Sequence, residues 1–252
     1  SGELDLRDNP WFAWDDFGRD LGSAEVDGAL VSGDYLSWVY TTRKYLGWNC
    51  GSGDGSALSD YSTGTSAYDS VQNNNCNVIV WAWCGQAGYC ADSKIVDYLY
   101  NMNQLELDYP NVTFVYMTGH VDGTGEDSTL RRHNDTIRNY CSDNGKKLFD
   151  FADIESYDPD GNYFGDRYVT DGSNYDANGD NVTEEQDNGS MPATPLNDDR
   201  NWAIDWQNAH EIGVDWYQCS IQSYHAQHLN HNLKAYAFWW MLSKISDLEN
   251  PL

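Results

Sequence analysis

The chain has 252 residues, with 40 Asp plus Glu against 14 Lys plus Arg, and a formal net charge of -26 at pH 7. This charge repels nucleic acid and anionic membrane surfaces and so argues against both as partners. Aromatic residues make up 14% of the chain, which predicts a folded core despite the charge. No run of 18 apolar residues occurs, so no membrane span is predicted. The length suits one domain covering residues 1–252.

The first half of the chain contains one clear strand and one clear helix. Residues 1–75 mix aromatic and acidic residues, and we expect loops and one helix near 35–46. The apolar, β-rich run 77–83 predicts a buried strand. Residues 93–109 then carry apolar side chains at helical spacing, and Pro110 ends this predicted helix.

The same alternation continues through the middle of the chain. Residues 112–118 predict a second buried strand, and residues 130–143 predict a helix that ends at a left-handed Asn144-Gly145 cap. A third short strand is predicted over 147–151. Strands that alternate with helices are typical of an α/β fold with a parallel sheet. Ligands of such sheets gather at the carboxyl ends of the strands, so Gly85-Gln86, Gly119-His120 and the segment 153–155 are expected to converge on one pocket.

A long polar insertion, residues 156–200, follows the third strand. Between residues 150 and 199 the chain has fourteen carboxylates and a single basic residue, Arg167. The insertion contains oxygen ligands at the spacing of a calcium loop, with Asn181 in place of the usual Gly. The predicted ligands are Asp176, Asn178, Asp180, the carbonyl of Val182, Glu184 and Asp187. A second cation site is expected from Asp158, Asp160, Asn162 and Asp171. The alternative is a solvated acidic loop.

Six cysteines indicate structural disulfides rather than a metal cluster, because none is arranged as Cys-x-x-Cys. Four Asn-x-Ser/Thr sequons fit an exported, glycosylated chain. They begin at Asn111, Asn134, Asn181 and Asn188. These features favour an extracellular or cell-surface location.

Three of the six histidines lie just before an apolar helical run near the C-terminus. His225 and His228 are candidates for a general base or a metal site, or else they cap the helix. At the first strand end, Gly85 offers a backbone N–H and Gln86 a side-chain amide, which are the donors that an oxyanion hole needs. Together the histidines and these donors indicate an acyl-transfer site.

Segments 78–86, 109–120, 137–141, 148–161 and 225–234 resemble an SGNH/GDSL-hydrolase-like family of exported microbial proteins. The resemblance implies a flavodoxin-like three-layer α/β/α domain with a mostly parallel sheet. It also implies ester hydrolysis by a serine nucleophile and a histidine base. Gly85 and Gln86 would then be the oxyanion donors, and His225 or His228 would be the base.

The chain departs from the SGNH pattern in two places. Gly33-Asp34 is followed by Tyr35 instead of serine, so the nucleophile block is missing and the domain is expected to be catalytically incomplete. Gln222 stands where an Asp is expected three residues before His225. We therefore expect that the first strand comes from a cleaved N-terminal fragment or a neighbouring copy of the chain, or that the fold has been remodelled.

Three functions remain open from the sequence. The first is an exported ester hydrolase that acts on a carbohydrate ester. The alternative is a non-catalytic, calcium-stabilised, disulfide-bonded and glycosylated extracellular protein that forms a filament or surface layer with copies of itself. The third is a carbohydrate-binding module, which would require an exposed row of aromatic side chains.

Overall fold

A computed structural model of the chain describes residues 78–80, 85–108, 110, 113–186, 194–219 and 226–249. The helix expected near 35–46, the candidate base His225, the candidate ligand Asp187 and the sequons at Asn111 and Asn188 lie outside these residues. Within the described ranges, no helix has both the length and the apolar character needed to cross a membrane.

The fold is α/β and is built around a parallel sheet in the order β1-β2-β3. Its strands are β1 (Val78–Val80), β2 (Thr113–Met117) and β3 (Lys147–Phe149). Ile79 pairs with Phe114, and Tyr116 pairs with Leu148. The predicted parallel arrangement of these three strands is confirmed, with β2 in the centre.

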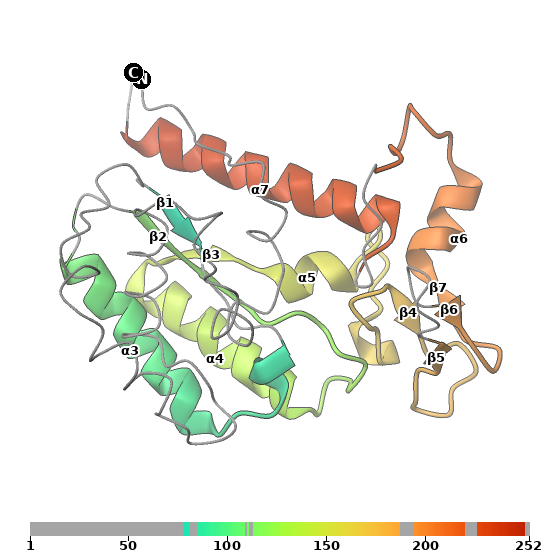
Figure 1. The fold of residues 1–252 in the computed structure, drawn as a ribbon, viewed down its shortest axis with the longest axis horizontal. Coiled ribbons are helices and arrows are strands. Elements are labelled where there is room, and N and C mark those ends of the chain that lie inside the picture. The colour runs from blue at the N-terminus through green and yellow to red at the C-terminus, as the bar shows by residue number, and fades with distance from the viewer. Residues whose placement is uncertain are drawn as a thin grey trace, which may run out of the picture.

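Helices α3 (Asp92–Asp108) and α4 (Thr129–Asn144) lie side by side on one face of the sheet (Figure 1). Phe114 and Tyr116 of β2 point to this face and pack into one buried cluster. The helices contribute Ile95, Tyr98, Leu99, Met102, Ile137 and Cys141 to the cluster. The Ser128 hydroxyl caps α4 by accepting from Arg131 N–H at 3.1 Å. At the other end, Gly145 has φ 62°, the predicted left-handed cap.

The other face of the sheet packs against α7 (His228–Glu249), which runs along the opposite side of the strands in Figure 1. Val115 of β2 and Phe149 of β3 form a buried cluster with Met241 and Ile245 of α7. Residues that alternate along β2 are thus buried on both faces of the sheet, which explains why that strand is a nearly continuous apolar run.

The third strand is shorter than the predicted span 147–151. It ends at Phe149 because Asp150 caps α5 (Phe151–Ser156), accepting from Asp153 N–H at 3.2 Å. Aspartate is favoured at a helix N-cap, where its carboxylate satisfies a backbone donor that has no partner within the helix. Phe151 therefore begins a helix.

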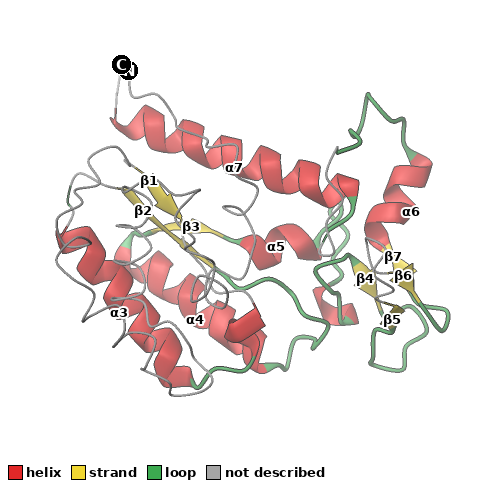
Figure 2. Cartoon of the chain, in the orientation of Figure 1, coloured by secondary structure: helices red, strands yellow, loops and turns green. Residues whose placement is uncertain are grey.

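The insertion folds together with the helix that follows it around a small second core beside the sheet (Figure 2). Phe164, Tyr175 and Trp202 form this core with Leu229 from the first turn of α7. The elements are η3 (Gly165–Arg167), β4 (Asn174–Tyr175), β5 (Glu185–Gln186), β6 (Thr194–Pro195), β7 (Arg200–Asn201) and α6 (Trp202–Ala209). Helix α7 spans both cores and joins them.

Candidate functional site

The carboxyl ends of the three strands lie close together. After β1, the chain forms η2 (Gly85–Gly88). Gly119, just after β2, lies so near to it that an added Cβ would be 2.7 Å from the Cβ of Ala87. Asn134 of α4 holds Gly119 by accepting from its N–H at 2.8 Å and donating to its carbonyl at 3.1 Å. Val121 N–H donates to Glu155 of α5 at 2.9 Å. The strand ends thus lie close together, while the prediction that they form one pocket stays a prediction.

His120 lies at this edge, directly after the central strand. Its Nδ1 is 2.8 Å from the Val121 carbonyl oxygen and 3.6 Å from Oδ2 of Asp171. A carbonyl oxygen can only accept, so Nδ1 carries the proton and Nε2 keeps a lone pair in the neutral ring. The side chains of His120 and Asp171 are 18% and 16% exposed. The pair is therefore partly shielded, and the imidazole has the tautomer of a general base.

Asp171 reaches this position from the insertion. Thr170 pairs with Asp122 in an isolated bridge, and Gly123 N–H donates to Val169 O at 3.0 Å. These contacts fasten the insertion to the loop that follows His120. The sequence predicts Asp171 as a cation ligand, whereas the structure places its carboxylate beside an imidazole.

A buried ion pair holds the backbone next to His120 in place. The Nζ of Lys234, on α7, lies 2.7 Å from Oε1 of Glu155, which is completely buried. The other carboxylate oxygen of Glu155 accepts from Val121 N–H, so the pair holds the backbone that orients the His120 ring. Burial raises the pKa of Glu155, and the positive charge of Lys234 opposes that shift. A buried pair of this kind fixes geometry more than it adds stability.

His228 does not have the geometry of an oriented base. Its Nδ1 accepts from Cys219 N–H at 3.2 Å, so the proton of the neutral ring lies on Nε2. Its ring stacks on Trp216 with centroids 6.2 Å apart. In the part of the chain that is described, His228 makes no ion pair with a carboxylate. The structure thus favours His120 over the predicted His228, which is the first residue of α7.

Cys219 lies next to His228 and Asn232. This arrangement has the residue types of a catalytic Cys–His–Asn site. The thiol contacts the His228 carbonyl rather than its ring, at 3.8 Å. Burial raises the pKa of Cys219, and a contact from the Asn232 amide opposes that shift. A thiol with a raised pKa is a poor nucleophile, so this trio is not an active cysteine site.

Gly85 and Gln86 lie in η2, at the strand end where the sequence predicts oxyanion donors. The Ala87 carbonyl accepts from His133 Nδ1–H at 2.8 Å, and His133 also lies 3.0 Å from Asp92 through Nε2. These contacts fix η2 against α4 and α3. The side chain of Gln86 lies outside the described residues, so its role as an oxyanion donor stays a prediction.

The calcium-like loop is organised by its own side chains. Asp176 accepts from Gly179 N–H at 2.6 Å and from Asn181 N–H at 2.8 Å. Asn178 accepts from Asp180 N–H at 2.9 Å, and Asp180 accepts from Val182 N–H at 3.0 Å. Asn181 has φ 70°, the left-handed conformation that the sequence predicts.

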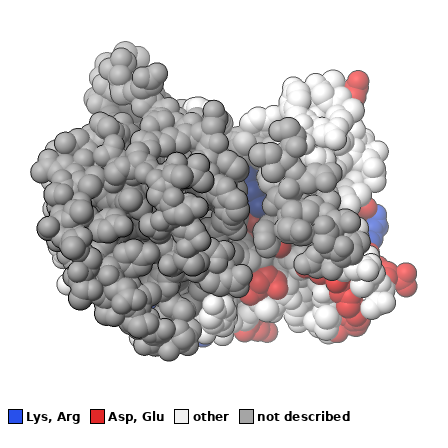
Figure 3. Space-filling view, in the orientation of Figure 1, with Lys and Arg blue, Asp and Glu red and all other residues white. Residues whose placement is uncertain are grey.

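Asp199 joins this loop from outside the predicted motif. Its carboxylate accepts from Ala177 N–H at 3.1 Å and from Glu184 N–H at 2.7 Å. Asp176 and Asp199 are each 8% exposed. Neither forms an ion pair with Lys or Arg among the described residues. Figure 3 shows other Asp and Glu side chains gathered on the surface of the insertion.

The proposed second cation site is spread over local contacts. Asp158 accepts twice from Asn162, from N–H and from Nδ2, both at 2.8 Å. Asp160 accepts from Trp206 Nε1 at 3.1 Å. Across the described ranges, no three His, Cys, Asp or Glu side chains are grouped closely enough to hold a metal ion. Any cation here would therefore rely on amide and carbonyl oxygens as well.

The structure also bears on the export signals. Asn134 is 2% exposed and fully engaged with Gly119, so this sequon cannot carry a glycan in the folded chain. Cys141 and Cys219 are free thiols, which excludes a full set of three disulfides. Cys50, Cys76 and Cys84 lie outside the described residues, so the remaining pairing stays a prediction.

No protein-family model matches the chain, and comparison with curated proteins and with solved structures gives no significant match. The functional interpretation therefore depends on the site residues themselves.

Proposed function

We propose that the chain is an exported, SGNH-like domain of the flavodoxin-like three-layer type that hydrolyses a carbohydrate ester. The observation that carries the proposal is the orientation of His120. Its Nδ1–H is held by Val121 O and faces Asp171, at the carboxyl edge of the central strand. In serine hydrolases the base is a histidine whose Nδ1–H is likewise fixed by an acceptor, there a carboxylate, and here the carboxylate of Asp171 lies 3.6 Å from the same nitrogen.

The proposed reaction follows from the position of the proton on Nδ1 of the neutral His120 ring. Nε2 of His120 takes a proton from an attacking serine hydroxyl or water, and the resulting imidazolium lies 3.6 Å from the Asp171 carboxylate, which stabilises it. The imidazolium then gives the proton to the departing alkoxide. Where serine is the nucleophile, His120 next takes a proton from a water that attacks the acyl-serine and returns this proton to the serine oxygen. Gly85 and Gln86, at the neighbouring strand end, are the proposed donors to the oxyanion. General-base catalysis contributes roughly 100- to 10,000-fold to such a rate.

His120→Gln tests the proposal, with His210→Gln as its matched control. His210 also donates through Nδ1 to a backbone carbonyl, Trp206 O, at 2.7 Å, and its ring stacks on Trp206. It makes no ion pair with a carboxylate in the described part of the chain. Hydrolysis of p-nitrophenyl acetate and of acetylated xylo-oligosaccharides should fall by at least about 100-fold in H120Q and remain unchanged in H210Q.

A fluorophosphonate probe then identifies the nucleophile. Covalent labelling of the wild-type chain, lost in H120Q, indicates a serine. Hydrolysis without labelling indicates an activated water. No hydrolysis by the wild-type chain, or full activity in H120Q, would contradict the proposal.

We also propose that the loop 176–184 binds Ca²⁺. The supporting observation is the burial of Asp176 and Asp199, which accept from backbone N–H groups but have no Lys or Arg partner among the described residues, since a buried charge without an opposite charge is costly. Oxygen ligands would come from Asp176, Asn178, Asp180, Val182, Glu184, Asp187 and Asp199. The ion would neutralise the loop and stabilise the insertion. The same loop favours the alternative function, a non-catalytic calcium-stabilised extracellular protein, which the activity assay distinguishes from the enzyme.

A further inference from the structure

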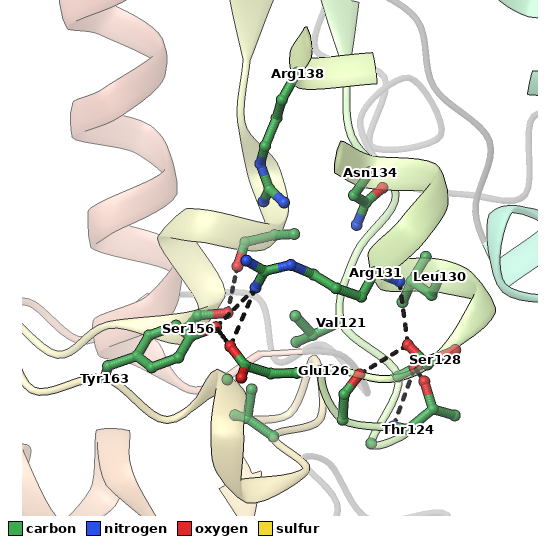
Figure 4. Close-up of a pocket in the computed structure, with 16 residues that line it drawn as sticks. Val121, Thr124, Glu126, Ser128, Leu130, Arg131, Asn134, Arg138, Ser156 and Tyr163 are labelled. Atoms are coloured by element: carbon green, nitrogen blue, oxygen red, sulfur yellow. Dashed lines mark hydrogen bonds and ion pairs between the residues drawn. The ribbon is translucent and has the colours of Figure 1, made fainter. Parts of the chain in front are cut away.

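A pocket opens between the loop that follows β2 and the start of the insertion (Figure 4). It encloses about 380 Å³ of space, part of it open to solvent. Val121 and Val169 belong to its wall, and they lie one and two residues from His120 and Asp171. This volume includes open solvent, so the pocket is a surface hollow rather than an enclosed cavity.

The loop that forms the rim is fixed by backbone contacts. Gly123 and Gly125 have φ 77° and 74°, a conformation that favours glycine. Gly123 N–H donates to Val169 O at 3.0 Å, and the Ser128 hydroxyl donates to Gly125 O at 2.8 Å. An added Cβ at Gly125 would lie 2.8 Å from the Tyr168 ring. The pocket is therefore largely preformed, which lowers the entropic cost of binding.

The polar groups of the pocket form one chain of donors and acceptors, visible in Figure 4. Arg131 Nη1 donates to the Tyr163 hydroxyl at 2.8 Å, and that hydroxyl donates to Glu126 at 2.8 Å. Arg131 also lies 3.6 Å from Glu126, and the two side chains are 38% and 47% exposed. Solvent, or a ligand, can thus reach a guanidinium, a phenol and a carboxylate at one place.

Both arginines of the pocket wall are already paired with carboxylates, and Asp122 adds a further carboxylate to the wall. Arg131 donates to Asp135 at 3.1 Å, and Arg138 is paired with Asp135 and Asp150 at 2.8 and 2.7 Å. An anionic ligand would have to displace these carboxylates in a chain that already has a net charge of -26. An acyl chain would have to desolvate the charged groups. A neutral ring with several hydroxyls can donate to Glu126 and accept from Arg131 without either cost.

We propose that this pocket binds one neutral sugar ring, held by Arg131, Tyr163 and Glu126. The inference rests on the proposed function where it identifies that ring as the sugar part of the ester substrate. Binding itself needs no catalysis. The pocket would then select the carbohydrate, while His120 activates the nucleophile that attacks the ester.

Saturation-transfer NMR and titration calorimetry with methyl β-xylopyranoside and methyl α-glucopyranoside test the inference on the full chain. Tyr163→Phe removes one hydroxyl and keeps the ring, so its affinity should fall by about 3- to 10-fold. Tyr157→Phe is the matched control. Tyr157 packs on Tyr163 with centroids 4.9 Å apart and is 38% exposed, but it is outside the pocket wall. Its replacement should leave affinity unchanged.

Three results would overturn the inference: no binding of either glycoside, equal affinity in Y163F and Y157F, or displacement of the glycoside by inorganic phosphate or butanoate. The two proposals fail separately. Glycoside binding without ester hydrolysis would support the sugar-binding proposal and contradict the proposed enzyme activity. Hydrolysis of acetyl esters without glycoside binding would support the enzyme activity and contradict the sugar-binding proposal.

Discussion

Replacing Lys234 with Met is the most informative perturbation of the packing around the site. The substitution keeps an apolar stem of similar length and removes the ammonium that lies 2.7 Å from Oε1 of Glu155. Glu155 is 0% exposed, so its charge would remain buried without its cationic partner. Removing one member of a buried pair costs about 3–5 kcal/mol. We expect K234M to lower the free energy of unfolding by that amount at pH 7.5.

The destabilisation caused by K234M should depend on pH, and the pKa of Glu155 determines in which direction it changes. Burial already raises the pKa of Glu155 above its ordinary value of 4.5, and loss of the opposing Lys234 charge raises it further. A folded-state pKa above the unfolded value means that the folded chain binds the proton first. The destabilisation in K234M should therefore be complete above the folded pKa and should shrink as pH falls toward 4.5.

Urea denaturation followed by tryptophan fluorescence at pH 7.5 and pH 5 measures both effects. Lys244→Met is the control, because Lys244 is exposed on the same helix and lies 5.8 Å from the Trp240 ring centroid. Its replacement should cost below about 1 kcal/mol at either pH. A cost for K234M no larger than that for K244M, or one that grows as pH falls, would refute the role given to the pair.

Three further predictions concern stability. Burial, then the charges of Lys234 and His228, lower the pKa of His231 to about 4 from 6.5, so the wild-type chain should lose stability as pH falls through that window. His231→Gln should remove part of that loss of stability. The part removed is at most about 3 kcal/mol, and solvent screening reduces it to about half of that value. Urea titrations at pH 7 and pH 4.5 measure the difference. Gly119→Ala should lower the free energy of unfolding by about 1–3 kcal/mol, because its Cβ would meet Ala87 at 2.7 Å; an unchanged melting temperature would contradict this close contact. Chelation should lower the wild-type melting temperature. The stabilisation lost is about 2.7 kcal/mol if Ca²⁺ is present at 100 times its Kd before the chelator is added. The melting temperature of Asp176→Asn should not respond to chelation. Equal responses of both chains would contradict the calcium proposal.

Local patterns predict most of the regular structure that is described. The apolar run around Val115 marks the central strand because both of its faces are buried. Gly145 marks the end of α4 because the left-handed cap is a local requirement. The early end of β3 also has a local cause, the capping carboxylate of Asp150, which a search for N-cap residues could have found.

The choice of His120 as the proposed base rests on tertiary structure and could not be predicted in the same way. His228 stands out in the sequence because it lies in a histidine cluster, yet its Nδ1 accepts from a backbone amide. His120 is a single histidine after a strand, and its carboxylate partner comes from the insertion. Only the docking of that insertion brings Asp171 to it. The position after a central strand was the one available signal.

The sequon at Asn134 is a second case in which tertiary structure decides what a local sequence pattern cannot predict. Its sequence pattern is that of a glycosylation site, but helix α4 turns the side chain inward to hold Gly119. Burial of one face of a helix depends on what packs against it, which a three-residue motif does not encode.

We propose that His120, held by the Val121 carbonyl and facing Asp171, is the base of an ester-hydrolysing site. Steady-state hydrolysis of acetylated xylo-oligosaccharides by the wild-type chain, H120Q and H210Q is the decisive measurement. We expect measurable turnover by the wild-type and H210Q chains and a decrease of at least about 100-fold in H120Q. Equal turnover by H120Q and H210Q, with both variants folded, would contradict it.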